Sequence, residues 1–325
     1  MDIIGDISKY RKQLMGLATI WIIYLHFCNY GNWKYIPFGL FNSLFGSVGV
    51  SIFCILSGMG IAFSLTKGNV LDYFIRRMRR LFPAIILICT PFFAYRDFFL
   101  NVEEHGVCRF FLDITGLSFW MFGDERFWYL YFIILMYLLS PIFNHCNSKC
   151  MGVVIVLVSI VFPFVLNACF NTFFVNAHLA IPRVTPYLIG FFLQKWGDTQ
   201  LKVTKRSFII IILTTLLAQP LRLLGNHILN RSVQVMIAIA IIMIFIRIYP
   251  YISKIAFMNK LLMFFGEHSL EFYLVHVALI WLFKGPWGLE LTELINLLLI
   301  FILTIMYGTF VHKVSLIEKG SASKK

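Results

Sequence analysis

A histidine inside a long apolar run is the residue of this sequence whose chemistry most needs explaining. His26 lies near the end of a run that begins at about residue 13. A neutral imidazole can take a proton from a hydroxyl group while that oxygen attacks a thioester. An ionisable side chain in such a run is expected to have a function or a hydrogen-bonding neighbour. His26 is therefore a candidate general base, with an interfacial, structurally bonded histidine as the alternative.

Four arginines follow the second apolar run, and their chemistry suits an anionic partner. Guanidinium groups hold phosphates through paired hydrogen bonds, and coenzyme A carries several phosphates. Basic clusters also mark the cytoplasmic side of membrane helices, where they bind anionic lipid. Both interpretations stay open, and the first predicts an acyl-CoA site at Arg76, Arg77, Arg79 and Arg80.

Two carboxylates and a histidine lie together in the apolar run 261–282. Glu267 and Glu271 are four residues apart, so one continuous helix would place them on the same face. With His276 they form a possible proton relay inside the membrane. The alternative is that Glu267 simply lies near the cytoplasmic end of the span, within reach of water.

Aromatic residues and an arginine begin two other runs, and small residues occupy a third. Trp128 and Tyr129 are either interfacial belt residues or stacking partners for sugar rings. Arg183 is positioned to contact an acidic group, so we predict that these three residues bind substrate. The segment Gly49–Gly58 favours close helix packing, with Ser57 as a lesser candidate nucleophile.

The composition places all of these residues in a membrane protein. Hydrophobic residues make up 60% of the 325 residues and charged residues only 13%, against about 25% charged residues in soluble domains. A span needs about 20 residues. We therefore predict an all-α bundle of ten transmembrane helices near 13–30, 44–65, 81–100, 127–145, 151–170, 184–196, 208–224, 232–249, 261–282 and 292–311.

The distribution of positive charge predicts the orientation of this bundle. If both termini are cytoplasmic, most of the lysines and arginines fall on the inner side, as membrane proteins require. The sixth run, 184–196, is short enough to be re-entrant instead. We predict one membrane domain over 1–325 that ends in a short basic cytoplasmic tail, 311–325. The net charge of +13 thus indicates a membrane lipid surface rather than nucleic acid.

Six segments, taken in order, resemble motifs of the acyltransferase 3 family, the membrane O-acyltransferases that modify bacterial surface polysaccharides. His26 stands where that family has an essential histidine, and the arginine cluster resembles its arginine-rich turn. The matching segments are Leu14–His26, Gly49–Gly58, Phe74–Pro83, Phe127–Leu130 with Tyr137–Pro141, Arg183–Gly190 and Gly266–His276.

The sequence also departs from the family pattern. Many members carry an arginine where this chain has Met15 and an acidic residue near Gln13, and many have a glutamate shortly after the tryptophan. The partner of His26 is therefore expected from outside the matched motifs, with Asp124 or Glu125 as candidates.

The resemblance implies an enzyme that transfers an acyl group, most commonly acetyl, from acyl-CoA to a carbohydrate acceptor. Acyl-CoA would be a co-substrate, with no permanently bound cofactor and no metal. The expected location is the cytoplasmic (inner) membrane, as a multi-pass protein. A transporter or flippase of a lipid-linked sugar or small solute is the alternative, since intramembrane histidines and glutamates also serve transport.

Overall fold

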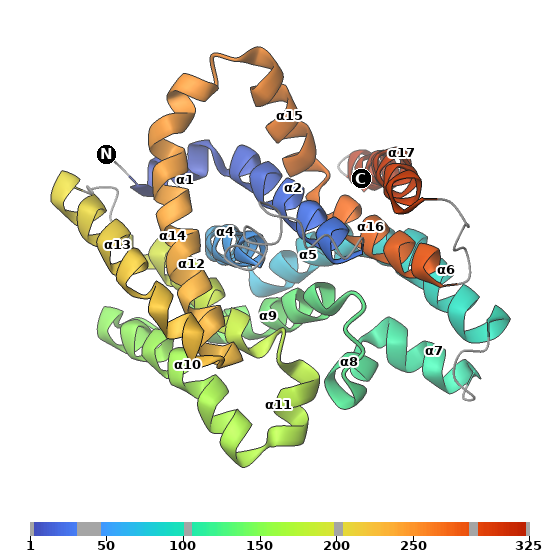
Figure 1. Ribbon diagram of the computed structural model, residues 1–325, viewed down its shortest axis with the longest axis horizontal. Helices are drawn as coiled ribbons and strands as arrows, with labels where there is room; N and C mark the ends of the chain where they lie inside the picture. Colours follow the sequence, from blue (N-terminus) through green and yellow to red (C-terminus); the bar gives the residue numbers. More distant parts are fainter. Residues whose placement is uncertain (1–2, 31–46, 101–105, 198–203, 286–291, 323–325) are drawn as a thin grey trace.

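The computed structural model describes residues 3–30, 47–100, 106–197, 204–285 and 292–322. Within these ranges the chain forms helices and no strands, which confirms the predicted all-α class. Figure 1 shows the helices gathered into one bundle, with the C-terminal helix at its edge.

The long helices follow the apolar runs of the sequence. The α-helices are α1 (Ile3–Lys9), α2 (Arg11–Tyr30), α4 (Val48–Leu65), α5 (Val70–Ala84), α6 (Thr90–Ala94), α7 (Gly106–Thr115), α8 (Leu117–Phe122), α9 (Trp128–Asn144), α10 (Lys149–Cys169), α11 (Asn171–Ala177), α12 (Val184–Trp196), α13 (Lys205–Leu217), α14 (His227–Ile252), α15 (Ala256–Glu267), α16 (Ser269–Lys284) and α17 (Glu293–Ala322). Two π-helical turns, Ile85–Cys89 and Tyr95–Phe99, continue α5 and α6, and short 3₁₀ helices cover Ile181–Arg183 and Gln219–Leu224.

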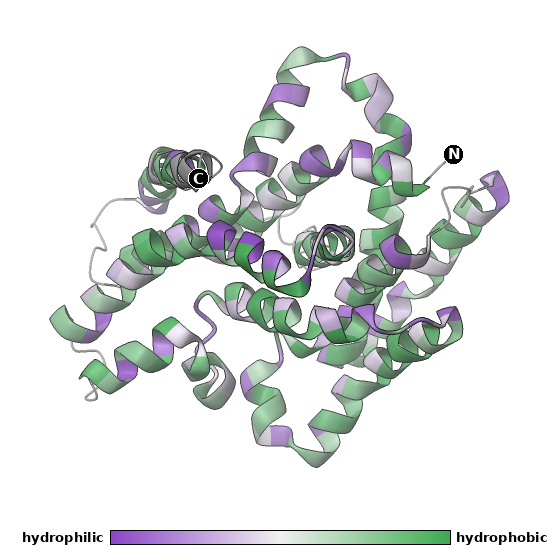
Figure 2. Ribbon diagram, turned by 180° about the vertical axis from the view of Figure 1, so that it is seen from behind, coloured by the Kyte–Doolittle hydropathy of each residue, from purple (hydrophilic) through white to green (hydrophobic). Residues whose placement is uncertain are grey.

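Five of these helical segments are long and apolar enough to cross a membrane. They are Val48–Leu65, Val70–Phe99, Lys149–Cys169, His227–Ile252 and Glu293–Leu316. The chain is thus a multi-pass membrane protein by length and composition, while the count of ten spans and the side of the termini remain predictions. The outer face of α10 fits a lipid environment, because Val153, Leu157 and Val161 are more than half exposed on successive turns. Figure 2 shows that hydrophobic residues make up much of most of the long helices.

The predicted continuous helix over 261–282 is wrong. The chain breaks at His268, so that α15 ends at Glu267 and α16 begins at Ser269, and Figure 1 shows two separate helices. Glu267 and Glu271 consequently do not share a helical face. Most of the predicted tail, 311–325, belongs to α17, which continues as a helix to Ala322; its cytoplasmic location stays a prediction.

Close contacts through glycine hold the centre of the bundle together. The central helix α4 packs against α12, α2 and α14, and Figure 1 shows it end-on among them. A methyl group at Gly58 of α4, or at Gly190 of α12, would collide with a main-chain carbonyl of the opposite helix. Gly16 of α2 and Gly266 of α15 form a second such pair. The packing interpretation of the segment Gly49–Gly58 therefore holds at Gly58.

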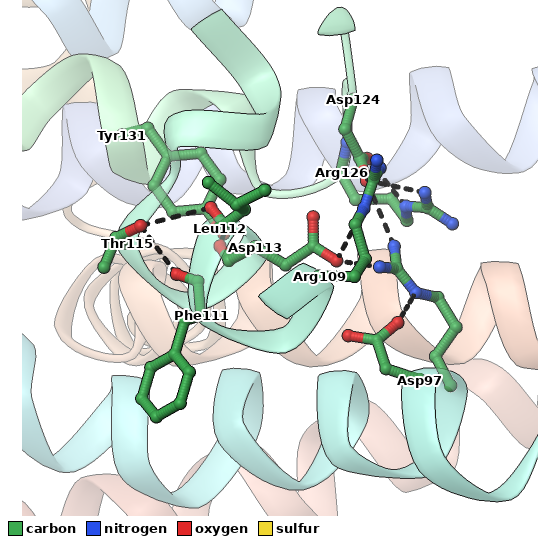
Figure 3. A network of polar contacts seen from close by, with 10 residues as sticks. Asp97, Arg109, Phe111, Leu112, Asp113, Thr115, Asp124, Arg126 and Tyr131 are labelled. Atoms are coloured by element: carbon green, nitrogen blue, oxygen red, sulfur yellow. Dashed lines mark hydrogen bonds and ion pairs between the residues drawn. The ribbon is translucent and has the colours of Figure 1, made fainter. Parts of the chain in front are cut away.

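A network of arginines and aspartates fixes the segment that precedes α9 (Figure 3). Arg96 is fully buried, and its guanidinium contacts three carboxylates. Nε lies 2.6 Å from Asp97 Oδ1, Nη1 lies 3.1 Å from Asp124 Oδ2, and Nη2 bonds Asp113. Because α7 carries Asp113 and the loop before α9 carries Asp124, this one side chain ties both to the long helix.

Two further arginines, Arg109 and Arg126, complete this network. Arg109 lies 3.2 Å from Asp113 and 3.4 Å from Asp124, and Arg126 lies 2.6 Å from Asp124. Burial raises the pKa of Asp124, but the hydrogen bonds and charge of Arg126, with the charge of Arg96, outweigh it and hold that pKa below its usual value of 3.8. The carboxylate therefore stays ionised and paired at neutral pH.

Candidate active site

One cavity of about 1040 Å³ brings the predicted chemical groups together. His26 of α2, Arg77 of α5, Tyr129 of α9 and Arg183 all line it. At a rise of about 1.5 Å per residue, Arg11 and His26 at its two ends lie roughly 22 Å apart along α2. The cavity is thus long, with Arg11 and Arg77 at one end and His26 at the other.

His26 forms a hydrogen-bonded pair with His276 of α16. The two ring nitrogens, His26 Nδ1 and His276 Nε2, are 2.7 Å apart, and His276 Nδ1 lies 2.6 Å from the carbonyl oxygen of Phe272. A carbonyl oxygen only accepts hydrogen bonds, so this network assigns the proton of His276 to Nδ1. His276 Nε2 must then accept a hydrogen bond from the N–H group at His26 Nδ1. In a neutral His26 this leaves Nε2 as the unprotonated, basic nitrogen.

Aromatic side chains enclose the cavity beside this pair. Trp128 and Tyr129 both line it, while their predicted role in substrate binding stays a prediction, and the Tyr129 ring meets Tyr273 edge-on at 5.6 Å between centroids. The helix that carries Trp128 and Tyr129, α9, begins directly after Phe127, a buried residue with a left-handed φ of 54°. A non-glycine residue adopts that backbone only at a local energetic cost, which the surrounding packing must hold. Ser57 Oγ lies 3.2 Å from the Tyr129 hydroxyl, the only partner that the described residues give it.

At the opposite end, two arginines lie beside successive turns of α4. Arg11 Nη2 donates to the Leu56 carbonyl at 3.2 Å, and Arg77 Nη2 donates to the Gly60 carbonyl at 3.3 Å. The Arg77 guanidinium also stands over the ring of Tyr137, 5.7 Å from its centroid. The described residues place no carboxylate in hydrogen-bonding contact with either guanidinium, so both carry positive charge into the cavity.

Arg80 lies at this end too, but its charge is already matched. It forms a two-point ion pair with Glu271, in which Nη2 lies 3.0 Å from Oε2. Glu271 is fully buried, and His312 Nδ1 of α17 lies 3.2 Å from Oε1. A two-point arginine–carboxylate pair is strong and geometrically specific. Arg80 therefore joins α5 to α16 and has less charge to offer a ligand than Arg77.

The four predicted phosphate-binding arginines divide by helix face. Arg77 and Arg80, three residues apart, line the cavity, whereas Arg76 and Arg79 do not. Arg76 donates instead to the carbonyls of Ser64 and Lys67, at 3.0 and 2.6 Å, and Arg79 is exposed.

Two more arginines, Arg183 and Arg231, lie at the His26 end of the cavity. Arg183 is buried, and it donates to the hydroxyls of Ser51 and Ser47, the latter at 2.8 Å, and to Gln234 Oε1 at 3.3 Å. Arg231 of α14 bonds the same Ser47 hydroxyl and lies 3.4 Å from the same Gln234 oxygen. The two guanidinium groups therefore converge on shared neutral acceptors.

The structure separates the three residues of the predicted proton relay. Glu267 lies 2.8 Å from Lys12, Glu271 binds Arg80, and His276 binds His26. They do not form one hydrogen-bonded chain: the break at His268 leaves Glu267 on α15, while Glu271 and His276 on α16 contact α5 and α2 respectively.

The partner of His26 also differs from the predicted acidic candidates. His276 holds that position, while the Asp124 carboxylate is engaged by arginines. Glu125 lines the cavity, and its carboxylate lies 3.6 Å from the His178 ring.

Several lining residues were not predicted from the sequence. Arg11 and Lys12 precede the first apolar run, where the sequence predicts only cytoplasmic charge. A charged side chain at such a position can also point into a cavity between the helices, as these two do. Arg231 carried a clearer signal, because it stands one residue before the expected span 232–249. Gln234 gave no signal, since a lone glutamine in a helix is common.

Comparison with known proteins gives one match. Residues 13–311 match the sequence profile of a family described as an acyltransferase domain. No curated protein and no solved structure matches the chain. The matched region contains His26, Arg77 and Arg183, and it begins just after Arg11.

Proposed function

The chain belongs to the acyltransferase 3 family, and we propose that it transfers an acyl group, in the first instance acetyl, from acyl-CoA to a hydroxyl group of a cell-surface or lipid-linked carbohydrate. The observation that carries this proposal is the single cavity. It has a basic imidazole nitrogen at one end and unmatched guanidinium groups at the other.

The donor would bind with its phosphates on Arg11 and Arg77. These groups have no carboxylate partner among the described residues, and Lys12 and Arg80 stand beside them. Arg76 and Arg79 lie outside the cavity, so their positive charges would only attract the nucleotide as it approaches. The pantetheine arm would extend past the apolar middle of the cavity, along Phe53 and Ile133, towards His26. We propose that this end faces the cytoplasm, where acyl-CoA is made.

The chemistry follows from the tautomers of the histidine pair. His26 Nε2 takes the proton of the acceptor hydroxyl as its oxygen attacks the thioester carbonyl carbon. The carbon–sulfur bond breaks, and the departing thiolate receives that proton from His26. The products are the sugar O-acyl ester and coenzyme A. His276 acts on His26, because its Nε2 accepts the Nδ1 proton and holds the ring in place.

The acceptor would enter beside the same imidazole. Trp128 and Tyr129 offer ring faces for stacking against a sugar, and Arg183 stands at the same end. Donor and acceptor would thus reach the reacting atoms from opposite ends of the cavity, as an enzyme of the inner membrane that modifies surface glycans requires.

Mass spectrometry of surface glycans tests this function. Cells with the protein should carry glycans heavier by one acyl group, which also identifies the group. Cells with His26→Ala should lack this mass although the protein inserts normally, whereas the exposed His145→Ala control should retain it. Full acylation with His26→Ala would refute the mechanism. Movement of lipid-linked sugar by the purified protein, without acyl transfer from acyl-CoA, would support the alternative, a transporter or flippase.

A further inference from the structure

The Arg183 end of the cavity concentrates more positive charge than the described side chains match, because Arg183, Arg231 and Lys284 face a single carboxylate, that of Glu125. Arg183 and Arg231 share the Ser47 hydroxyl and the Gln234 oxygen as acceptors, and both acceptors are neutral. Two like charges held on the same atoms repel each other, most strongly away from water. The two arginines therefore form a site prepared for an anion rather than a structural ion pair.

Burial strengthens this interpretation. Arg183 is only 1% exposed, yet its Nε atom is buried without a hydrogen-bond partner. A buried donor left without a partner is energetically unfavourable, so native proteins rarely keep one without a reason. Arg231 is partly exposed to the cavity, where a ligand can reach it.

The backbone adds to the same field. Ser47 precedes the first residue of α4, an 18-residue helix, so the positive end of its dipole meets the two guanidinium groups. The other charged side chains that line this end are Lys284 and Glu125. Glu125 is the single carboxylate among them, and its side chain is 56% exposed.

We propose that Arg183 and Arg231 bind an oxyanion of the acceptor, so that the acceptor is an anionic carbohydrate bearing a carboxylate or a phosphate. This inference rests on the proposed function, because it takes the His26 end as the acceptor end. Planar guanidinium forks suit both oxyanions, and neutral sugars would lack this anchor.

Gln234→Glu tests the site with the least disturbance. The substitution keeps the shape of the side chain but places a carboxylate between the two guanidinium groups. The variant should be at least as heat-stable as the wild-type protein and should lose oxyanion binding, because the site then contains its own anion. Arg231→Gln provides a second route, since it removes half of the charge. Arg206→Gln is the matched control, because Arg206 is exposed on α13, outside the cavity.

Binding is measured by calorimetry on protein in nanodiscs of zwitterionic lipid, with three probes. Trigalacturonate carries carboxylates, glucose 1-phosphate carries a phosphate, and maltotriose is neutral. At least one anionic probe should bind the wild-type protein about tenfold or more tightly than maltotriose, as charged hydrogen bonds allow. The anionic probe that binds more tightly identifies the oxyanion as a carboxylate or a phosphate. Both site variants should reduce the preference to about twofold, while Arg206→Gln keeps it.

Acetyl-CoA binding to the same preparations separates this inference from the function it rests on. The inference is overturned if the anionic probes bind no better than maltotriose, if Gln234→Glu keeps the preference or loses stability, or if Arg231→Gln weakens acetyl-CoA instead. The proposed function fails, by contrast, if wild-type protein neither binds acetyl-CoA nor transfers its acyl group, whatever the sugar probes do.

Discussion

Two buried arginines in this protein have opposite surroundings. Arg96 is 0% exposed and Arg183 is 1% exposed. Arg96 contacts three carboxylates in the network of Figure 3, whereas Arg183 contacts hydroxyl and amide oxygens and has a second arginine beside it. A buried charge that the protein matches with its own groups contributes to the fold. One that it leaves unmatched is available to a ligand.

The same contrast exists at the other end of the cavity. Arg80 is matched by the buried Glu271 and links two helices, while Arg11 and Arg77 have carbonyl and aromatic partners only. This difference is why we assign the phosphates of the donor to Arg11 and Arg77.

Replacing each buried arginine by glutamine should separate these roles most strongly. Arg96→Gln leaves three aspartates without their central partner, so we expect a loss of about 3–5 kcal/mol or failure to fold. Arg183→Gln leaves neutral acceptors that Arg231 still bonds, and it removes the repulsion between the two arginines, so the loss should be at most about 1–2 kcal/mol. Thermal unfolding in detergent, followed by size-exclusion chromatography, measures both. Equal destabilisation would contradict the distinction.

A second, smaller effect is expected at His276, which positions His26 rather than contacting substrate. His276→Leu removes the acceptor for the His26 Nδ1 proton, so the rate of acyl transfer should fall about 100-fold. The KM for acetyl-CoA should stay the same, because the donor phosphates lie at the other end. His276→Gln can still accept that proton through Oε1 and should restore part of the rate. An equal loss with leucine and glutamine would argue for a purely structural role.

The smallest effect concerns the Arg126–Asp124 ion pair in the arginine–aspartate network of Figure 3. The pKa of Asp124 is held below 3.8, so its pairing with Arg126 stabilises the fold above the pKa of the unfolded chain. That contribution disappears as the pH falls through the lower pKa of the folded protein. Arg126→Gln should therefore be less stable by roughly 1 kcal/mol at pH 7. The difference in unfolding temperature between the two proteins should shrink below pH 3.8. A constant difference down to pH 3 would show that this ion pair contributes nothing.

The sequence predicts the helices of this bundle better than the directions of its side chains. Where the structure describes them, the expected spans fall on helices, because a long apolar run in a bilayer must satisfy its backbone hydrogen bonds internally; residues 44–46 of the second span lie outside the described residues. The break at His268 was not predicted, since no proline marks it. It follows from tertiary packing, in which Gly266 brings α15 against α2 while α16 packs on α17.

The candidate site could be predicted only in part, because its side chains come from helices whose packing no local pattern encodes. Polarity in an apolar run drew attention to His26, Arg183 and His276, which the structure does bring to one cavity region or to each other. Helical spacing alone could have separated Arg77 from Arg79. The His26–His276 contact joins residues 250 positions apart, and no local pattern encodes it.

Two measurements on one pair of variants test the central claim that the two ends of a single cavity divide the work. Acetyl-CoA affinity and the maximal rate of acyl transfer are compared for His26→Ala and Arg77→Gln in nanodiscs. We predict that His26→Ala binds acetyl-CoA with unchanged affinity and loses transfer. Arg77→Gln should bind it about tenfold more weakly and keep its rate at saturation. Loss of acetyl-CoA binding in His26→Ala, or unchanged affinity in Arg77→Gln, would contradict the account.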